Sequence, residues 1–281
     1  MGAPSPSSPP LHVLAAALRE ERHFSELLGG YSVELAEAHL VVNEKVPVPR
    51  FNFVQDVRCG GGRVAAFVER TLEHYYQRAL RPTFEVPLDA PREGVRRALG
   101  LAGYDSRGET HLRHLLVWDR TQTPARVLAA GPNGDHELTV EPLEEDELDV
   151  FVDLVAESQM RFREEVRRYV EVGMSHPNPG ERVVPYVARK RGEPVSFGLF
   201  LAHPGASGLF AVGTATSARE QGCASALVAE VLRREGARAA DPLCISAEGQ
   251  APPRPLLELG FRPWATFEIF ELSGSAAKKG Y

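Results

Sequence analysis

Residues 219–224 read Arg219-Glu220-Gln221-Gly222-Cys223-Ala224, between a strand-like run at Gly208 to Ala215 and an apolar helix. The helix is indicated by apolar residues three and four positions apart: Ala224, Leu227, Val228, Val231 and Leu232. A loop of small residues at a helix start leaves backbone N–H groups without partners, and the helix dipole adds a positive field there. The stretch therefore predicts an anion site suited to a pyrophosphate. The alternative is a tight strand–helix turn with an exposed arginine.

The composition is that of a globular protein large enough for two domains. The chain has 281 residues, against about 150 for a typical domain. Its hydrophobic content is 43% and its charged content 25%, which are ordinary values for a folded protein. The net charge of −6 comes with no basic face of the kind that nucleic acid requires. We therefore expect no nucleic-acid partner and only a small, locally held anion.

The cysteines and the hydropathy pattern favour a cytoplasmic protein. Cys59, Cys223 and Cys244 share no metal-ligand spacing, and an odd count argues against a disulfide framework. No apolar run approaches the roughly 20 residues of a membrane span. We therefore expect no metal site, no membrane partner and reduced thiols.

Changes in composition predict the domain boundaries. Residues 1–10 are rich in proline and serine and are expected to be a disordered N-terminus. The segment 121–135 carries two prolines and two glycines and reads as a linker between domains at 11–120 and 136–273, with a flexible tail at 274–281. The two halves end alike, in Ala102-Gly103-Tyr104 and Leu259-Gly260-Phe261, which indicates a weak internal repeat.

Residues 137 to 272 resemble the GNAT superfamily of acyl-CoA-dependent N-acyltransferases. The residues that carry the resemblance are the loop at 219–224, Gly213-Thr214 before it, and Leu259-Gly260-Phe261 about forty residues later. The resemblance implies an α/β (α+β) fold with two GNAT-like mixed-sheet domains in tandem, the C-terminal one more complete. The counterpart loop of the first half would be Arg58-Cys59-Gly60-Gly61-Gly62-Arg63, which ends in arginine where the family has glycine or alanine. Because a large side chain there obstructs a phosphate, only the second half is expected to bind cofactor.

The resemblance also implies the cofactor and its position. Acetyl-CoA would act as co-substrate and lie between the strand at Gly208 to Ala215 and the strand at Leu243 to Ala247. The backbone of the first strand would pair with the pantetheine arm, and the loop, with the Ser225 hydroxyl, would hold the pyrophosphate. The residues expected to bind it are Val212, Gly213, Thr214, Arg219, Glu220, Gln221, Gly222, Cys223, Ala224 and Ser225.

Acyl transfer also needs a group that deprotonates the amine and one that protonates the leaving thiolate. Glu248 is the candidate base, and Glu165 and Glu171 are alternatives; each also reads as solvated surface. The family often has a tyrosine acid where this chain has Leu256, and an asparagine where it has Gly249. Tyr169 is the candidate substitute acid, unless it is a cleft-wall aromatic.

Two further residue types carry alternatives. Cys223 is either an acylated nucleophile or, more simply, a side chain that fills space at the helix start. His111 and His114 have a metal-like spacing but no further ligands nearby, so they are expected on a strand-edge surface.

The sequence thus predicts an N-acyltransferase that moves an acetyl group from acetyl-CoA to a small-molecule or peptide amine by direct attack in a ternary complex. The alternative is a non-catalytic acyl-CoA-binding or regulatory protein. The sequence also allows a homodimer.

Overall fold

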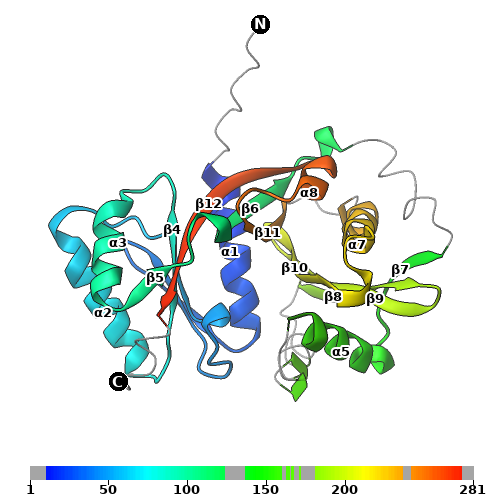
Figure 1. Cartoon of the computed structure of the whole chain (residues 1–281), viewed down its shortest axis with the longest axis horizontal. Coiled ribbons are helices and arrows are strands. Elements are labelled where there is room, and N and C mark those ends of the chain that lie inside the picture. Colours follow the sequence, from blue (N-terminus) through cyan, green and yellow to red (C-terminus); the bar gives the residue numbers. More distant parts are fainter. Residues whose placement is uncertain are drawn as a thin grey trace, which may run out of the picture. The chain divides into compact units, whose positions relative to one another are not determined.

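The computed structural model describes residues 11–123, 137–159, 163–164, 166–167, 171, 181–236 and 242–273. It is a mixed α/β structure, which confirms the expected fold class (Figure 1). The described strands are β1 Tyr31–Glu34, β2 His39–Val42, β3 Phe53–Gln55, β4 Thr83–Pro87, β5 Tyr104–Ser106, β6 Leu112–Trp118, β7 Leu138–Pro142, β8 Arg182–Lys190, β9 Glu193–His203, β10 Ala206–Thr214, β11 Leu243–Gly249 and β12 Phe261–Leu272. The helices are α1 Leu11–Leu27, α2 Val64–Tyr76, α3 Arg92–Leu101, α5 Leu148–Gln159, α7 Cys223–Val231 and α8 Arg254–Glu258.

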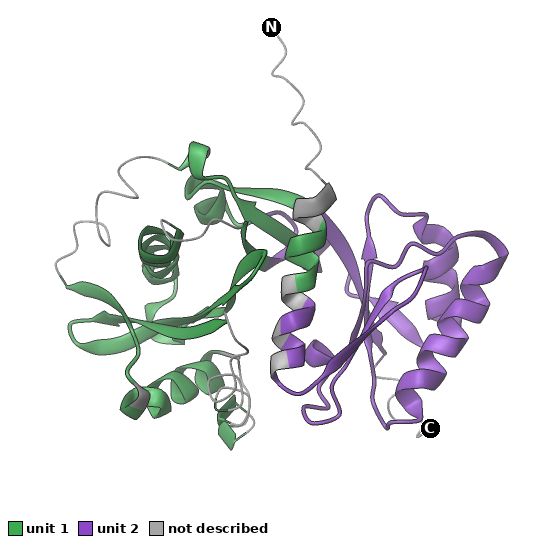
Figure 2. Cartoon of the chain, turned by 180° about the vertical axis from the view of Figure 1, so that it is seen from behind, with its two compact units in different colours: residues 1–21, 115–246, 253–264 green, residues 22–114, 247–252, 265–281 purple. Residues whose placement is uncertain are grey.

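The chain divides into two compact units (Figure 2). Unit 1 comprises Met1–Glu21, Leu115–Ser246 and Pro253–Trp264, and unit 2 comprises Arg22–His114, Ala247–Pro252 and Ala265–Tyr281. The hydrogen-bonded strand order is β1-β2-β3-β4-β12-β6-β11-β10-β9-β8-β7, and β5 pairs with β12. Since β6, β11 and β12 each supply residues to both units, neither unit is a continuous piece of sequence. The sequence-based boundaries at 11–120 and 136–273 remain a prediction about folding domains.

In unit 1, the antiparallel strands β7 to β10 are covered on opposite faces by α5 and α7 (Figure 1). The β8–β9 hairpin turns at Arg191 and Gly192, whose φ values of 55° and 86° are those of a type I′ turn. Phe151 of α5 packs edge-to-face on Phe197 of β9, with 5.6 Å between ring centroids. This pair fixes α5 against the strands that precede the loop.

The Leu259-Gly260-Phe261 stretch ends α8, also in unit 1. Gly260 has a φ of +93°, and a Cβ there would lie 2.6 Å from the Thr123 hydroxyl. The Leu259 carbonyl accepts hydrogen bonds from the Trp118 indole and from Thr123. Helix α8 begins late, at Arg254, so Pro255 falls in its first turn, where proline is tolerated.

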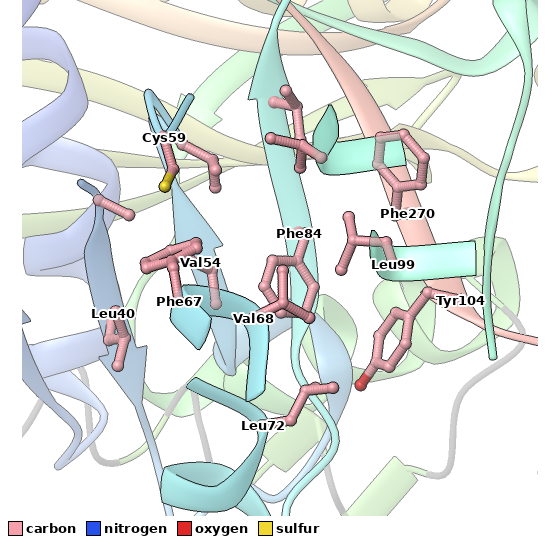
Figure 3. Packing of buried hydrophobic residues seen from close by; sticks show 14 of the residues in the cluster. Leu40, Val54, Cys59, Phe67, Val68, Leu72, Phe84, Leu99, Tyr104 and Phe270 are labelled. Carbon is pink, nitrogen blue, oxygen red and sulfur yellow. The ribbon is translucent and has the colours of Figure 1, made fainter. Parts of the chain in front are cut away.

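Unit 2 has its own apolar core, between α2, α3 and its strands (Figure 3). Phe67, Val68 and Leu72 lie on one face of α2, since Leu72 follows Val68 by four positions. They pack against Val54 and Phe84. The last strand of the chain completes this core, because Phe270 of β12 belongs to it and residues 267–270 pair with β4.

A buried carboxylate also holds β12 in unit 2. Glu268 is 5% exposed and accepts hydrogen bonds from Ser106 (2.7 Å) and from the Arg96 guanidinium (2.8 Å). Arg92 lies 3.7 Å away. A charge removed from water needs such partners, so they tie β12 to α3 and β5.

Of the helices within the described ranges, none has the combination of length and apolarity that a membrane span requires.

Candidate functional site

Strands β10 and β11 separate halfway along. They pair in parallel only at Ser207–Leu243, Gly208–Cys244 and Leu209–Ile245. Beyond these pairs β10 continues to Thr214 and β11 to Gly249 without a further pair among the described residues. At Gly213 and Thr214 the backbone of β10 is held by β9 on one side, and on the other side the described residues include no ladder pair with β11 from Val212 to Thr214.

A β-bulge in β10 accounts for the separation. The pairing with β9 shifts between Phe210 and Gly213, and Ala211 has a φ of +49°. A bulge bends its strand and increases the local twist, so β10 diverges from the line of β11. The opening thus begins where the bulge begins.

Position 213 has no room for a side chain, so a glycine is required there. A Cβ on it would lie 2.4 Å from Phe197 Cζ and 3.0 Å from Ser158 Oγ. Its carbonyl accepts a 2.6 Å hydrogen bond from the Ser196 hydroxyl, which also lies 3.1 Å from the Thr214 hydroxyl. The bulged backbone is thereby fixed in one conformation.

Ser158 faces the same point from α5. Its hydroxyl oxygen is buried and has no hydrogen-bond partner within the part of the chain that the structure describes. Buried hydroxyls are usually paired, so an orphan next to the opening is a group available to a ligand. Sequence reasoning missed Ser158, because a single serine on an amphipathic helix carries no signal of its own.

The loop after β10 has the geometry of an anion site. Gly222 is the N-cap of α7 in the left-handed region, with φ 77° and ψ 3°, and no side chain caps the helix. The first helical hydrogen bond runs from the Ala226 N–H to the Gly222 carbonyl at 3.0 Å. The N–H groups of Cys223, Ala224 and Ser225 therefore precede the helical ladder and are free to point at a ligand.

The side chains around these N–H groups leave room for that ligand. Gly222 is exposed, and a Cβ built on it would meet no atom within 4 Å. Ala224 and Ser225 are half-buried. Cys223 is 2% exposed, which fits the interpretation of it as a space-filling side chain.

Two charged or polar side chains of the loop are hydrogen-bonded elsewhere. Arg219 is exposed and donates to the Ser158 carbonyl at 3.3 Å, which links the loop to α5. Gln221 accepts from Lys190 at 3.2 Å and donates to the Ser217 carbonyl at 3.0 Å. The residues predicted to bind the cofactor lie on three consecutive elements, namely β10, the loop and the first turn of α7.

The corresponding place in unit 2 has no opening. Strands β3 and β4 pair in parallel at Phe53–Thr83 and Val54–Phe84, and the Val57 N–H still donates to the Glu85 carbonyl at 3.3 Å. A hydrogen bond thus still joins the two segments at the residue before the loop at 58–63. The Arg63 side chain at the end of that loop is 76% exposed.

The candidate catalytic residues differ in exposure and in their partners, and two of them are not described. Glu248 of β11 is exposed and forms an ion pair with Arg107 at 3.0 Å, both in unit 2. Leu256 is buried in α8 and offers no proton. Tyr169 and Glu165 lie outside the described residues. Glu171 is exposed and pairs with Arg167 at 3.3 Å.

The structure corrects the expectation for His114. It is 3% exposed and not on a strand-edge surface, with Nδ1 3.1 Å from the Thr266 hydroxyl and Nε2 3.1 Å from the Gly249 carbonyl. Burial between these two partners makes it a structural residue of unit 2. His111 is exposed, with Nδ1 2.9 Å from the Thr110 hydroxyl.

Solved structures of similar shape agree on one fold. A GCN5-related N-acetyltransferase from Kribbella flavida matches with a TM-score of 0.65 at 16% identity, over 94% of this chain and 98% of that one. A GCN5-related N-acetyltransferase from Sphaerobacter thermophilus matches with a TM-score of 0.64 at 15% identity, over 94% and 93%. A tandem GNAT protein from the clavulanic acid biosynthesis pathway, solved without AcCoA, matches with a TM-score of 0.51 at 13% identity, over 84% and 78%.

Sequence comparison adds nothing to this, since no protein-family model and no curated protein matches the chain. The chain has the GNAT fold, as the loop and the Leu259-Gly260-Phe261 stretch predicted. At these identities the likeness establishes the fold, and function has to be argued from the site.

Proposed function

We propose that the chain is an N-acyltransferase that transfers an acetyl group from acetyl-CoA to a small-molecule or peptide amine in a ternary complex. The observation that carries the proposal is the succession, in unit 1, of the stretch Val212 to Thr214, where β10 has no ladder pair with β11 among the described residues, and an uncapped N-terminus of α7. An extended ligand with amides and a pyrophosphate, such as acyl-CoA, is complementary to both.

The residues on these elements fit that ligand. The backbone of Val212, Gly213 and Thr214 would pair with the amides of the pantetheine arm. The N–H groups of Cys223, Ala224 and Ser225 would bind the pyrophosphate, because the helix dipole and the free donors both favour an anion. Bound acyl-CoA would supply an activated thioester, and the protein would hold the amine and the carbonyl in attack geometry.

Substitution at the loop tests the binding half of the proposal. Ala224→Arg places at the start of α7 the residue that Arg63 supplies before α2, and the large side chain would occupy the space of the phosphates. We expect the Kd for acetyl-CoA, measured by calorimetry, to rise at least about tenfold, a loss of about 1.4 kcal/mol.

Arg63→Ala is the matched control and should leave the Kd unchanged, because the ladder between β3 and β4 stays closed. A wild-type chain that binds no acetyl-CoA would overturn the whole proposal.

Proton transfer is assigned to Glu248 as base and Tyr169 as acid, and the Ser158 hydroxyl is proposed to donate to the ligand at the opening. We expect Glu248→Gln and Tyr169→Phe each to lower kcat by about 10²–10⁴ with little change in the Kd for acetyl-CoA. In contrast, we expect Ser158→Ala to raise the Kd for acetyl-CoA, because the ligand loses a hydrogen-bond donor. Turnover is read from released thiol over a panel of amines, and unchanged kcat in a variant removes that residue from the assignment.

A non-catalytic acyl-CoA-binding role is the second candidate. It is favoured by the buried Leu256, which stands where the family often has its acid. Tight binding of acetyl-CoA without thiol release for any amine would decide for this role.

A further inference from the structure

Unit 2 carries an apolar groove on its surface, and none of the groove's lining residues belongs to the cofactor elements. It has a volume of about 700 Å³ and is formed by one face of α2 and the end of α3. Its lining residues are Ala65, Val68, Glu69, Leu72, Glu73, Tyr76, Gln77, Ala98, Leu101 and Ala102. Leu101 is 84% exposed and Tyr76 43%, an unusual exposure for large apolar side chains. Exposed apolar grooves of this kind mark binding surfaces.

The charge of the groove is of one sign. Its lining includes two carboxylates, Glu69 and Glu73, and no lysine, arginine or histidine. Both glutamates are exposed and lie four positions apart on α2, one above the other. The groove therefore suits a segment with small or aromatic side chains and positive charge.

The end of β12 leads directly to this groove. Strand β12 pairs with β5 in the register Phe270–Ser106, Glu271–Asp105 and Leu272–Tyr104. The Ser273 N–H then donates to the Gly103 carbonyl at 2.9 Å. Gly103 is the chain neighbour of Ala102, which lines the groove, so the described part of the chain ends beside the groove.

We propose that the segment following Ser273 docks in the α2–α3 groove of its own chain. The segment reads Gly274-Ser275-Ala276-Ala277-Lys278-Lys279-Gly280-Tyr281. It has small residues first, then two lysines, then a tyrosine, which matches an apolar floor with an acidic rim. Five residues from Ser273 to Lys278 reach up to about 17 Å when extended. Tyr76 and Glu69 are only about 10 Å apart along the helix axis.

In the docked state Lys278 and Lys279 pair with Glu69 and Glu73, and apolar side chains cover Leu101 and Tyr76. The segment then extends the hold on β12 beyond its last hydrogen bond to Gly103. This inference does not depend on the proposed function, since it concerns a surface of unit 2 that the cofactor residues do not share.

Cross-linking of the full chain tests the contact. A carbodiimide joins a lysine to a carboxylate only when they are in direct contact, and mass spectrometry identifies the joined peptides. We expect links from Lys278 or Lys279 to Glu69 or Glu73 in the monomeric fraction, and their loss in the Glu69→Gln/Glu73→Gln variant. Glu93→Gln, on the exposed part of α3 and outside the groove, is the control and should leave the links intact.

Limited trypsin cleavage after Lys278 and Lys279 gives a second readout. Proteolysis follows the fraction of chains in which the segment is undocked, so a segment docked nine-tenths of the time is cleaved about ten times more slowly. The Glu69→Lys/Glu73→Lys variant should restore the faster rate. Links found only in a dimeric fraction would assign the groove to the segment of a second copy. Absence of links together with equal cleavage rates in wild type and variant would overturn the proposal outright.

Discussion

At the scale of single residues, the candidate site depends on positions where a side chain is absent or unpaired. Gly213 leaves room for Phe197 and Ser158, and Gly222 adopts a left-handed conformation at the start of α7. These two glycines determine the shape of β10 and of the loop. Both are among the residues that carry the resemblance in the sequence, Gly213 before the loop and Gly222 within it.

Replacement of Gly213 by alanine tests the first of them. The added Cβ would lie 2.4 Å from Phe197 Cζ, so either the ring or the bulged strand must move. We expect a loss of about 1–3 kcal/mol in the free energy of unfolding, measured with urea, and weaker binding of acetyl-CoA. Gly62→Ala is the control, because a Cβ there meets no atom within 4 Å. Equal stability of the two variants would show that β10 is not constrained in this way.

At the scale of elements, the C-terminal turn of α7 is organised around a buried charge. Glu230 is 4% exposed and accepts hydrogen bonds from Arg233, at 2.5 and 2.7 Å, and from Arg234. Burial raises the pKa of Glu230, but the hydrogen bonds from Arg233 and Arg234 outweigh it, and the net pKa lies below the ordinary value of 4.5. The cluster therefore fastens the helix whose other end carries the loop.

A lowered pKa makes this contribution depend on pH. A carboxylate that is more acidic in the folded state stabilises the fold above its unfolded pKa, and this stability is lost as the pH falls through the folded pKa. We expect Glu230→Gln to lower the free energy of unfolding by about 1–2 kcal/mol at pH 7, since the two arginines are more than a third exposed and solvent screens the pair. The difference from wild type should shrink as the pH falls below about 4.5.

Urea titrations between pH 7 and pH 3 provide the measurement. Glu258→Gln, which removes an exposed partner of Arg254, should change stability by less than about 0.5 kcal/mol at any pH. A Glu230→Gln deficit that stays constant down to pH 3 would contradict the assignment.

At the scale of the whole molecule, the two units differ in one respect that bears on function. In unit 1 the parallel pairing of β10 with β11 ends at Leu209–Ile245, whereas in unit 2 a hydrogen bond from Val57 to Glu85 still joins the two segments beyond the last β3–β4 pair, Val54–Phe84. An extended ligand can pair with a strand only where that strand has unpaired backbone groups. The molecule should therefore have a single cofactor site.

Calorimetric titration with acetyl-CoA should accordingly give one bound molecule per chain. Unlike the Kd measurement on Ala224→Arg, the stoichiometry tests the difference between the units. Two equivalent sites per chain would show that the closed ladder of unit 2 opens for ligand, and the loop at Arg58–Arg63 would then have to be counted as functional.

Much of the local structure could be predicted from the sequence. Apolar spacing placed the helix after the loop, which the structure has at Cys223–Val231, and the strand-like run at Gly208 to Ala215 is the second part of β10. These features depend on neighbours within a few positions, so a short stretch of chain contains the information. The fold was implied by the resemblance to the GNAT superfamily, which rests on the loop at 219–224 together with Leu259-Gly260-Phe261 about forty residues later.

The strand partners, the opening and the burial of single polar groups were decided only by tertiary structure. Nothing in Phe261–Leu272 shows that its second half pairs with β4, or that Glu268 meets Arg96 from 172 positions away. His114 looked like a surface residue until Thr266 and Gly249 enclosed it. The reason is physical: pairing and burial depend on contacts between distant segments, whose register no local pattern determines. The sequence alone thus determined the loop, the helix behind it and the GNAT fold, and the tertiary structure decided where β10 leaves β11 and which side chains lie at that opening.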